Sequence, residues 1–537
     1  MKEFFQNMSS LFEEVIQLEM ISLHYLWLLI PLVLLYMFIS DVANKQQTIK
    51  HNFPVVGRLR YLLESIGPEL RQYIVANNRE ELPFNRSERS WIYASSKKEN
   101  NLEGFGTDKN IFGSGHIFIN PNLFPYQLSP THPNRMNPYF LPCAKVMGAY
   151  NKRKRPFRPY SVVNISAMSY GSLSKNAVKA LNMGSMAVGT YHNTGEGGLS
   201  PYHAYGGDVM FHFGTGYFGV RDEAGNFSME KLIQLVDQKP FIRAIEVKLS
   251  QGAKPGKGGI LPGKTVDAEI AAIRGIKKGE SALSPASHTA FTSVREMLEF
   301  IEDSAEKTGL PVGFKAAVGK LTMWEEVAEW MLSTGKGPDF ITIDGGEGGT
   351  GAAPHSFADH VSMPFVFAFS DVYKIFAERG LTNRVVFIAS GRLGLPAKAL
   401  MAFAMGADCI QVAREAMLSI GCIQAKKCHD NTCPVGITTQ NKWLMSGLNP
   451  ENKAGRYANY IKTLLKEMLD ITNDCGFEHP AQFTIRVVEM GTGDANSILT
   501  LEESFGYQKV EVPFTNTQAL LDCSYLGGLA KATSTTT

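Results

Sequence analysis

The chain has 537 residues, which is too long for a small disulfide-stapled scaffold and enough for several domains or one large barrel with additions. Its 53 Lys and Arg residues against 51 Asp and Glu residues give a net charge of +2, so composition indicates no nucleic-acid-binding surface. Hydrophobic residues make up 44% of the chain, which permits a sizeable core and excludes a disordered protein.

Residues 1–45 are predicted to hold a membrane anchor, with a single transmembrane helix over about 21–39. This stretch contains no charged residue, and no small-residue cleavage pattern follows it, which argues against a signal peptide. Only Lys2 precedes it, whereas the basic residues just after it are Lys45, Lys50, Arg58 and Arg60. The positive-inside rule therefore predicts a cytoplasmic catalytic domain. The alternative is a buried core helix, which His24 and Pro31 keep open.

Residues 46–159 are predicted to form a linker and an irregular N-terminal subdomain, because they are polar and show little periodicity. From residue 160, short apolar runs alternate with helical stretches, most clearly at 311–317, 340–343, 385–389 and 409–412. Parallel strands need such crossovers, so residues 160–445 predict an α/β fold, a (β/α)8 TIM barrel with its chemistry at the strand C-terminal ends. Residues 446–537 are predicted to be a helical C-terminal extension.

Glycine-rich turns follow two neighbouring predicted strands. The first, at 345–351, formally contains the G-x-G-x-x-G pattern of dinucleotide-binding folds, but Pro354 and Pro364 interrupt the helix that pattern requires. The second, at 390–394, ends the next strand. Glycines let backbone N–H groups approach an anion, so adjacent turns of this kind favour a phosphate held between them, with ligand-free tight turns as the alternative.

Cysteines cluster at Cys422, Cys428 and Cys433, and a proline follows the last of them. Iron–sulfur clusters are held by Cys thiolates, and Cys-Pro recurs at the end of such runs. Three cysteines therefore favour a three-iron cluster or one with a missing ligand. Zinc, with His429 as a fourth donor, and unrelated buried thiols are the alternatives.

A further motif runs from Lys248 to residue 259, after the predicted strand FIRAIEV. Its cationic and amide side chains at a strand end suit a dicarboxylate, and a buried lysine there can donate a proton. Taken alone, the stretch favours the alternative of a solvated basic loop.

Together these stretches resemble the FMN-binding synthase domain of glutamate synthases. The matching strings are SAMSYGSLS (166–174), NTGEGG (193–198), VKLSQGAKPGKGG (247–259), DGGEGGTGAAP (344–354) and GCIQAKKCHDNTCPVG (421–436). The resemblance covers about 160–445 and implies a (β/α)8 barrel carrying FMN and a 3Fe-4S cluster. It also implies an oxidoreductase of the EC 1.4 class, acting on CH–NH2 groups, that reductively aminates 2-oxoglutarate to glutamate with ammonia.

The resemblance further implies the roles of individual residues. The cluster ligands are Cys422, Cys428 and Cys433. The residues along the flavin and its phosphate are Ala167, Met168, Ser169, Gly346, Gly348 and Gly391. Lys248 aligns with the family's proton-donating lysine, and Glu196 with the glutamate of the loop through which ammonia arrives. The residues aligned with those that hold the 2-oxoglutarate carboxylates are Gln251, Lys254 and Arg274.

Several features depart from that family. No glutaminase precedes the matched region, so free or partner-supplied ammonia is expected, and the electron donor, ferredoxin-like or a partner reductase, is unidentified. Lys257, Ile260 and the stretch 284–293 differ from the family's residues, which bears on the substrate. The membrane span and the C-terminal region differ as well. The alternatives are an FMN-dependent (β/α)8 oxidoreductase acting on another small amino or keto acid, and a non-enzymatic membrane scaffold.

Overall fold

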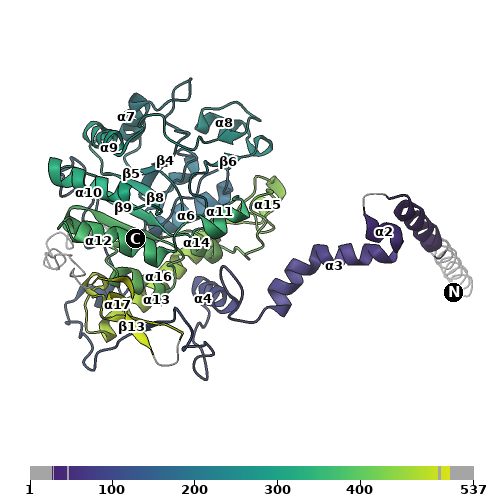
Figure 1. Cartoon of the computed structure of the whole chain (residues 1–537), viewed down its shortest axis with the longest axis horizontal. Coiled ribbons are helices and arrows are strands. Elements are labelled where there is room, and N and C mark those ends of the chain that lie inside the picture. Colours follow the sequence, from purple (N-terminus) through teal and green to yellow (C-terminus); the bar gives the residue numbers. More distant parts are fainter. Residues whose placement is uncertain (1–26, 28, 45–46, 494–496, 508–537) are drawn as a thin grey trace, which may run out of the picture. The chain divides into compact units, whose positions relative to one another are not determined.

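The computed structural model describes residues 27, 29–44, 47–493 and 497–507, and the chain divides between Asn85 and Arg86 into two compact units (Figure 1). The stretch 46–159, predicted as one segment, is therefore split. Its first part belongs to the N-terminal unit, and the remainder is packed into the same unit as the barrel.

Within the described residues of the second unit, eight parallel strands form a closed barrel. In barrel order the strands are β2 (Val163–Ile165), β3 (His192–Asn193), β4 (Val209–Phe213), β5 (Ile242–Lys248), β8 (Val312–Ala317), β9 (Phe340–Asp344), β10 (Val386–Ser390) and β11 (Cys409–Val412). The last strand closes on the first, with Val412 opposite Ile165. The predicted (β/α)8 barrel is confirmed.

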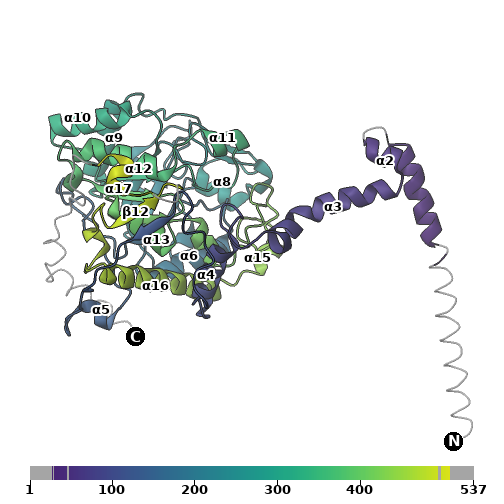
Figure 2. The ribbon, with the colours of Figure 1, turned by 60° about the horizontal axis from the view of Figure 1, so that its bottom comes forward.

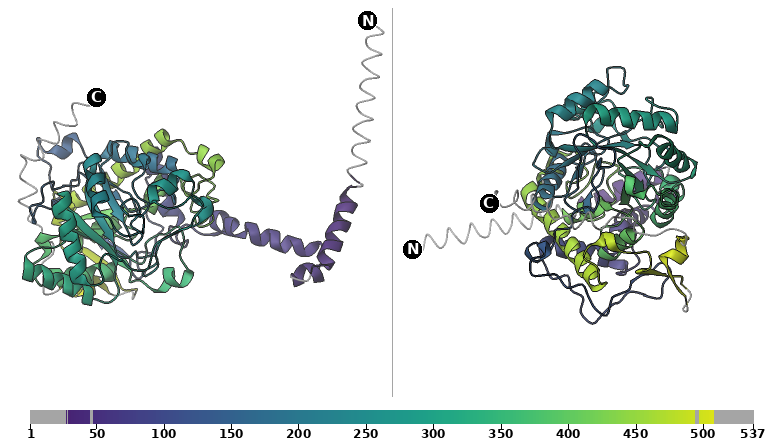
Figure 3. Two further views of the ribbon diagram at one scale, coloured as in Figure 1. Left: turned by 90° about the horizontal axis from the view of Figure 1, so that it is seen from above. Right: turned by 90° about the vertical axis from the view of Figure 1, so that its left-hand side faces the viewer.

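Helices surround these strands (Figure 3). They are α6 (Lys175–Val188), α7 (Met229–Gln238), α9 (Val294–Thr308), α10 (Thr322–Thr334), α12 (Phe365–Ala377), α13 (Pro396–Ala404) and α14 (Arg414–Ser419). Local sequence sets their ends, as α9 illustrates. The Ser293 side chain accepts a hydrogen bond from the Glu296 N–H at the start, and Gly309 adopts a left-handed conformation at the end. The strands are largely buried because helices cover their outer faces, and β9 and β10 are buried along their whole length.

Short strands and helices lie in the segments that connect or follow the barrel strands. An antiparallel pair, β6 (Ile260–Leu261) and β7 (Ala282–Leu283), and helix α8 (Ala268–Arg274) follow β5. The remaining short helices of this part are η2 (Pro201–His203), η3 (Gly263–Thr265), α11 (His355–His360), η4 (Thr382–Arg384) and α15 (Lys442–Ser446).

The C-terminal region, predicted as a helical extension, contains short strands as well as helices. Helix α16 (Pro450–Asp474) packs beside α6 and α4 (Arg86–Lys97), as Figure 2 shows. It is followed by η5 (Pro480–Gln482), β12 (Val488–Gly491), β13 (Ile498–Thr500) and α17 (Leu501–Phe505). In the described part of the chain β12 pairs with β13 and with β1 (Ile117–Ile119), which α5 (Pro133–Met136) follows. Strands of three or four residues are too short to show alternation in the sequence, and β1 is remote from its partner.

The N-terminal unit is helical where it is described. Residues 29–42 form a helix, followed by α2 (Thr48–Asn52), α3 (Val56–Leu70) and η1 (Arg71–Val75). The predicted span at 21–39 begins outside the described residues. Among the residues that are described, no helix combines the length and the apolar character needed to cross a membrane.

Candidate active site

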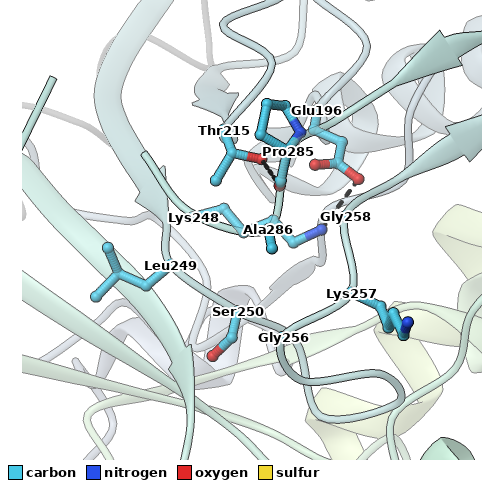
Figure 4. A pocket seen from close by; sticks show the side chains of 10 residues that line it. All are labelled: Glu196, Thr215, Lys248, Leu249, Ser250, Gly256, Lys257, Gly258, Pro285 and Ala286. Carbon is cyan, nitrogen blue, oxygen red and sulfur yellow. Dashed lines mark hydrogen bonds and ion pairs between the residues drawn. The ribbon is translucent and has the colours of Figure 1, made fainter. Parts of the chain in front are cut away.

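Charged side chains meet at the mouth of the barrel. Lys248 is the last residue of β5, and Glu196 lies in the loop after β3. The Lys248 Nζ lies 3.0 Å from Glu196 Oε1, as Figure 4 shows. It also donates a hydrogen bond of 2.7 Å to Gln251 Oε1. The structure therefore brings three of the predicted site residues together at the strand C-terminal ends, where barrel enzymes carry their active sites.

Lys254 adds positive charge to this group. Its side chain is buried, and its Nζ donates a hydrogen bond of 3.0 Å to the Ala352 carbonyl in the loop after β9. Burial and the neighbouring Lys248 lower the pKa of Lys254, against an opposing effect of Glu196. Burial raises the pKa of Glu196, but Lys248 outweighs it and the net shift is downward, so the carboxylate is ionised at neutral pH. The excess of positive charge suits an anionic substrate.

Glycines make room for the Glu196 carboxylate. A Cβ atom at Gly214 would lie 2.5 Å from Glu196 Oε2, and one at Gly259 would lie 2.2 Å from Oε1. Side chains at either position would push the carboxylate away from Lys248. The backbone of the loop after β4 and that of the Lys248 motif therefore define where Glu196 sits.

A pocket opens beside this pair (Figure 4). Its lining residues are Glu196, Thr215, Lys248, Leu249, Ser250, Gly256, Lys257, Gly258, Pro285 and Ala286. Thr215 Oγ1 donates a hydrogen bond of 2.6 Å to the Pro285 carbonyl, which ties the stretch 284–293 to the loop after β4. The Lys257 ammonium lies 5.1 Å from the centroid of the Phe357 ring. Of the sequence positions that depart from the family, Lys257, Pro285 and Ala286 line this pocket.

Arg274 does not line the pocket. It ends α8, and its guanidinium lies over the Phe218 ring at 5.1 Å and donates a hydrogen bond of 3.0 Å to the Tyr170 carbonyl. Its Nε is buried and has no hydrogen-bond partner among the described residues. Burial lowers the pKa of Arg274 to about 10, against an opposing effect of Glu196. Arg274 therefore lies within electrostatic reach of Glu196, with one buried donor uncommitted to the protein.

A buried carboxylate that sequence reasoning missed lies deeper in the barrel. Glu246, two residues before Lys248 on β5, is fully buried. Its Oε2 accepts a hydrogen bond of 2.7 Å from Asn193 and lies 2.6 Å from His212 Nδ1, and its Oε1 accepts a bond of 2.5 Å from Thr342. Burial raises the pKa of Glu246, but the hydrogen bond and charge of His212 and the other partners bring it down to about 2.

His288 was also missed. Its Nε2 lies 2.8 Å from the Lys248 carbonyl oxygen and its Nδ1 lies 3.0 Å from the Tyr217 hydroxyl. The ring therefore fixes the end of β5. His288 lies in the stretch 284–293, which was noted in the sequence only for its departure from the family. A histidine within that stretch was the feature that could have identified it.

The residues expected along a flavin lie on the same rim. Ala167, Met168 and Ser169 directly follow β2 and are half-buried. A Cβ atom at Gly195 would lie 2.6 Å from the Ser169 nitrogen, so this segment packs against the loop that carries Glu196. The residues expected to lie along a flavin and those expected to hold the substrate thus share one face of the barrel.

A buried lysine, missed in the sequence, joins this rim. The Lys315 Nζ, on β8, lies 3.4 Å from Ser166 Oγ and 3.5 Å from Asp344 Oδ1. Asp344 also accepts hydrogen bonds of 2.7 Å from Ser390 Oγ and 2.9 Å from the Gly252 N–H. A lysine near the end of a barrel strand was the signal that could have found it.

The glycine turns after β9 and β10 lie side by side. Cβ atoms at Gly345 and Gly391 would lie 2.5 and 2.8 Å from Phe365 Cβ, and one at Gly346 would lie 2.9 Å from the Ser362 carbonyl oxygen. Arg414, the first residue of α14, donates to the Glu347 carbonyl between these turns and the end of β11. Backbone without side chains and a half-buried guanidinium at the last strands of the barrel are a donor set that fits a phosphate.

The cysteine loop follows α14. Burial, together with nearby Cys428 and Cys433, raises the pKa of Cys422 to about 12. The Tyr93 hydroxyl donates a hydrogen bond of 2.7 Å to the Cys422 carbonyl, which anchors the loop to α4. In the described ranges, no three His, Cys, Asp or Glu side chains are grouped to hold one metal ion.

A closed parallel barrel with this charged, glycine-lined mouth is the architecture of a barrel enzyme. Residues 132–478 match the family described as "Conserved region in glutamate synthase", and the chain belongs to that family. It is 39% identical over 489 residues to "Glutamate synthase large subunit-like protein YerD" of Bacillus subtilis, covering 85% of this chain and 92% of that protein.

Proteins named as glutamate synthases are also similar to the chain. "Archaeal glutamate synthase (NADPH)" of Methanocaldococcus jannaschii is 35% identical over 315 residues, and the match covers 58% of this chain and 59% of that protein. "Archaeal-type glutamate synthase (NADPH)" of Thermotoga maritima is 36% identical over 318 residues, with the same coverage of 58% and 59%. The matched region thus spans less than two thirds of these relatives.

Proposed function

We propose that this chain is an FMN-dependent, iron–sulfur oxidoreductase that reductively aminates 2-oxoglutarate to glutamate with ammonia. The observation that carries the proposal is the convergence of Lys248, Glu196, Gln251 and Lys254 at the barrel mouth of a glutamate synthase family member. The positive charge of that group suits a dicarboxylate. The names of the archaeal-type relatives support the same reaction.

In the proposed reaction, the C2 oxygen of the keto acid leaves as water, nitrogen from ammonia replaces it, and C2 gains a hydride. When bound, FMN would supply that hydride, and the 3Fe-4S cluster would deliver the electrons that restore it. Lys248, held between Glu196 and Gln251, would donate the proton that the departing oxygen needs. Glu196 would accept hydrogen bonds from the incoming ammonia.

The carboxylates of the substrate would be held by Lys254 and Gln251, with Arg274 contributing its buried, uncommitted Nε. Guanidinium groups pair well with carboxylates and stay charged at any working pH.

Residues on the same rim would hold the cofactors. The proposed flavin residues are Ala167, Met168, Ser169, Lys315, Gly346, Gly348, Gly391 and Arg414. The proposed cluster ligands are Cys422, Cys428 and Cys433. We propose an external electron donor, either a ferredoxin-like protein or a partner reductase, and ammonia from solution or from a partner.

We also propose that the chain is a single-pass membrane protein with a cytoplasmic catalytic domain. The uncharged stretch 21–39 and the basic residues after it support this. Extraction of cell membranes with alkaline carbonate tests it, because a spanning chain stays with the lipid. Release of the chain into the soluble fraction would contradict it.

The catalytic proposal is tested by reoxidation of the reduced flavin in anaerobic rapid mixing. We expect 2-oxoglutarate and ammonia together to reoxidise it and yield glutamate, and either one alone to fail. Lys248→Ala should slow the reaction by roughly 10²- to 10⁴-fold at saturating substrate, as expected for a general acid. Lys320→Ala, which removes an exposed lysine after β8, is the matched control and should react at the parent rate.

Different outcomes point to different alternatives. Faster flavin reoxidation by another keto acid with ammonia would show that this keto acid, and not 2-oxoglutarate, is the substrate. A purified protein without flavin absorbance would support a non-enzymatic scaffold. A parent rate for Lys248→Ala would show that this lysine does not donate the proton.

A further inference from the structure

Helix α3 carries an apolar face that nothing in its own unit covers. At about 100° per residue, the large apolar side chains of α3 fall within an arc of roughly 120°, which is the width of a single helix face. They are Val56, Leu59, Leu62, Leu63, Ile66 and Leu70, and each is between 41% and 72% exposed. A face this wide and this exposed is not explained by packing within the described residues of the N-terminal unit.

Polar side chains occupy the rest of the helix. Arg58 and Arg60 each lie about 40° beyond an edge of the apolar arc, and Glu69 lies about 20° beyond one of those edges. Glu64 and Ser65 lie about 60–80° beyond the arc. Arginines near such an edge can extend their stems along apolar surface and keep the guanidinium in a polar layer. The helix surface is therefore divided into an apolar face and a polar face of mixed charge, which matches an interface between an apolar and a polar layer.

A buried aspartate sets the angle at which α3 leaves the preceding helix. Asp41, at the end of the helix 29–42, is 1% exposed. It accepts hydrogen bonds of 2.9 Å from the Val55 N–H and from Arg58 Nε, and Arg58 Nη2 lies 2.8 Å from its Oδ1. Figures 2 and 3 show the helix 29–42 and α3 meeting at a bend next to α2. The two helices therefore form a fixed elbow.

The helix before the elbow is apolar on all sides. Its exposed large residues are Leu29, Ile30, Leu32, Val33, Leu34, Leu35, Tyr36, Phe38 and Ile39. An all-round apolar helix suits the hydrocarbon of a membrane, whereas a helix with one apolar face and basic edges suits its surface. The elbow therefore joins a helix that is apolar on all sides to a helix with one apolar face.

We propose that α3 is an interfacial helix, lying along the surface of a lipid bilayer. Its apolar arc would face the acyl chains, and Arg60, near the edge of the arc, would contact the phosphates. The elbow at Asp41 would keep α3 at an angle to the helix 29–42, so the bilayer would be contacted by both. This inference rests on the proposed membrane attachment and is independent of the proposed catalytic function.

The test places a genetically encoded fluorescent amino acid in the full chain, at Leu63 on the apolar arc or at Ser65 on the polar side. The chain is reconstituted into vesicles of phosphatidylcholine and phosphatidylglycerol. Aqueous iodide and a lipid with a nitroxide high on its acyl chain are the quenchers. We expect the label at Leu63 to resist iodide and to be quenched several-fold by the nitroxide lipid, with the reverse at Ser65.

Three outcomes would overturn the proposal. Iodide quenching at both positions would mean that the apolar arc faces water. Shielding at Leu63 without nitroxide quenching would mean that protein covers it, as in a dimer of this chain. Nitroxide quenching at both positions would mean that α3 is inserted into the hydrocarbon. A second pair, Leu59 and Glu64, repeats the comparison if a label at the first pair disturbs the helix.

Discussion

The buried carboxylate of Glu246 offers a quantitative test of the barrel interior. In the folded chain its pKa is about 2, against an ordinary value of 4.5. A difference of about 2.5 pKa units at 1.36 kcal/mol each means that the fold favours the ionised over the neutral group by about 3 kcal/mol. Glu246→Gln places a neutral group of the same shape there, so we expect it to lose about 3 kcal/mol of unfolding free energy at pH 7.

The hydrogen bonds support the same magnitude. Asn193, His212 and Thr342 all bond to the carboxylate, and a bond to a charged group contributes about 1.5–3 kcal/mol, against 0.5–1.5 for a neutral one. Losing about 1 kcal/mol at each of these bonds gives a similar total. The pKa shift and the hydrogen bonds thus give the same loss of unfolding free energy, and that free energy is the quantity to measure.

The sign of the pH dependence follows from the lowered pKa. The stabilisation by Glu246 is present above pH 4.5 and is lost as the pH falls toward about 2. Urea titrations at pH 7 and pH 3.5 should therefore show the gap between parent and Glu246→Gln narrowing from about 3 to about 2 kcal/mol.

Glu299→Gln is the matched control for this measurement. It removes an exposed carboxylate that is paired with Arg295 four residues earlier, and it should change stability by no more than about 0.5 kcal/mol. A parent-like stability of Glu246→Gln at pH 7 would refute the reasoning. So would a gap that widens in acid, because the carboxyl group would then be neutral in the fold.

Further substitutions test the site. Gly214→Ala should displace the Glu196 carboxylate and lower the rate of glutamate formation by about 10²-fold while far-UV circular dichroism stays unchanged; a parent rate would show that the carboxylate position is unimportant. Cys428→Ser should remove the iron and the paramagnetic signal of a cluster, whereas Cys475→Ser, at the end of α16, should retain both; equal iron in the two variants would contradict the ligand assignment. Lys315→Met should weaken FMN binding by at least tenfold in a fluorescence titration of the apoprotein, and unchanged affinity would remove this lysine from the flavin site.

The barrel could be predicted because its strands are fully buried. FITID, for example, became β9 (Phe340–Asp344), buried along its whole length, since helices cover parallel strands on the outside. The local motif around Lys248 was equally accessible, because Gln251 is only three residues away and bonds directly to it. Contacts between residues so close in sequence can be predicted from their spacing.

Contacts between distant segments could not be predicted in the same way. The partners of Glu246 come from β3, β4 and β9, and no local pattern indicates which inward side chains share a level of the barrel. The pairing of Ile117 with Met490 joins segments from opposite ends of the second unit. Arg274 was placed by resemblance alone, and its position over Phe218 depends on how α8 folds back toward β2.

The pairing of the first barrel strand, β2, with the last, β11, has a consequence for folding during translation. Val163 leaves the ribosome about 250 residues before Val412, and at 5–20 residues per second this is a delay of roughly 12 to 50 s. During that time one edge of β2 has no partner strand, and unpaired strand edges template aggregation. We therefore expect the nascent chain to be most prone to aggregation until the last strand is made and covers that edge.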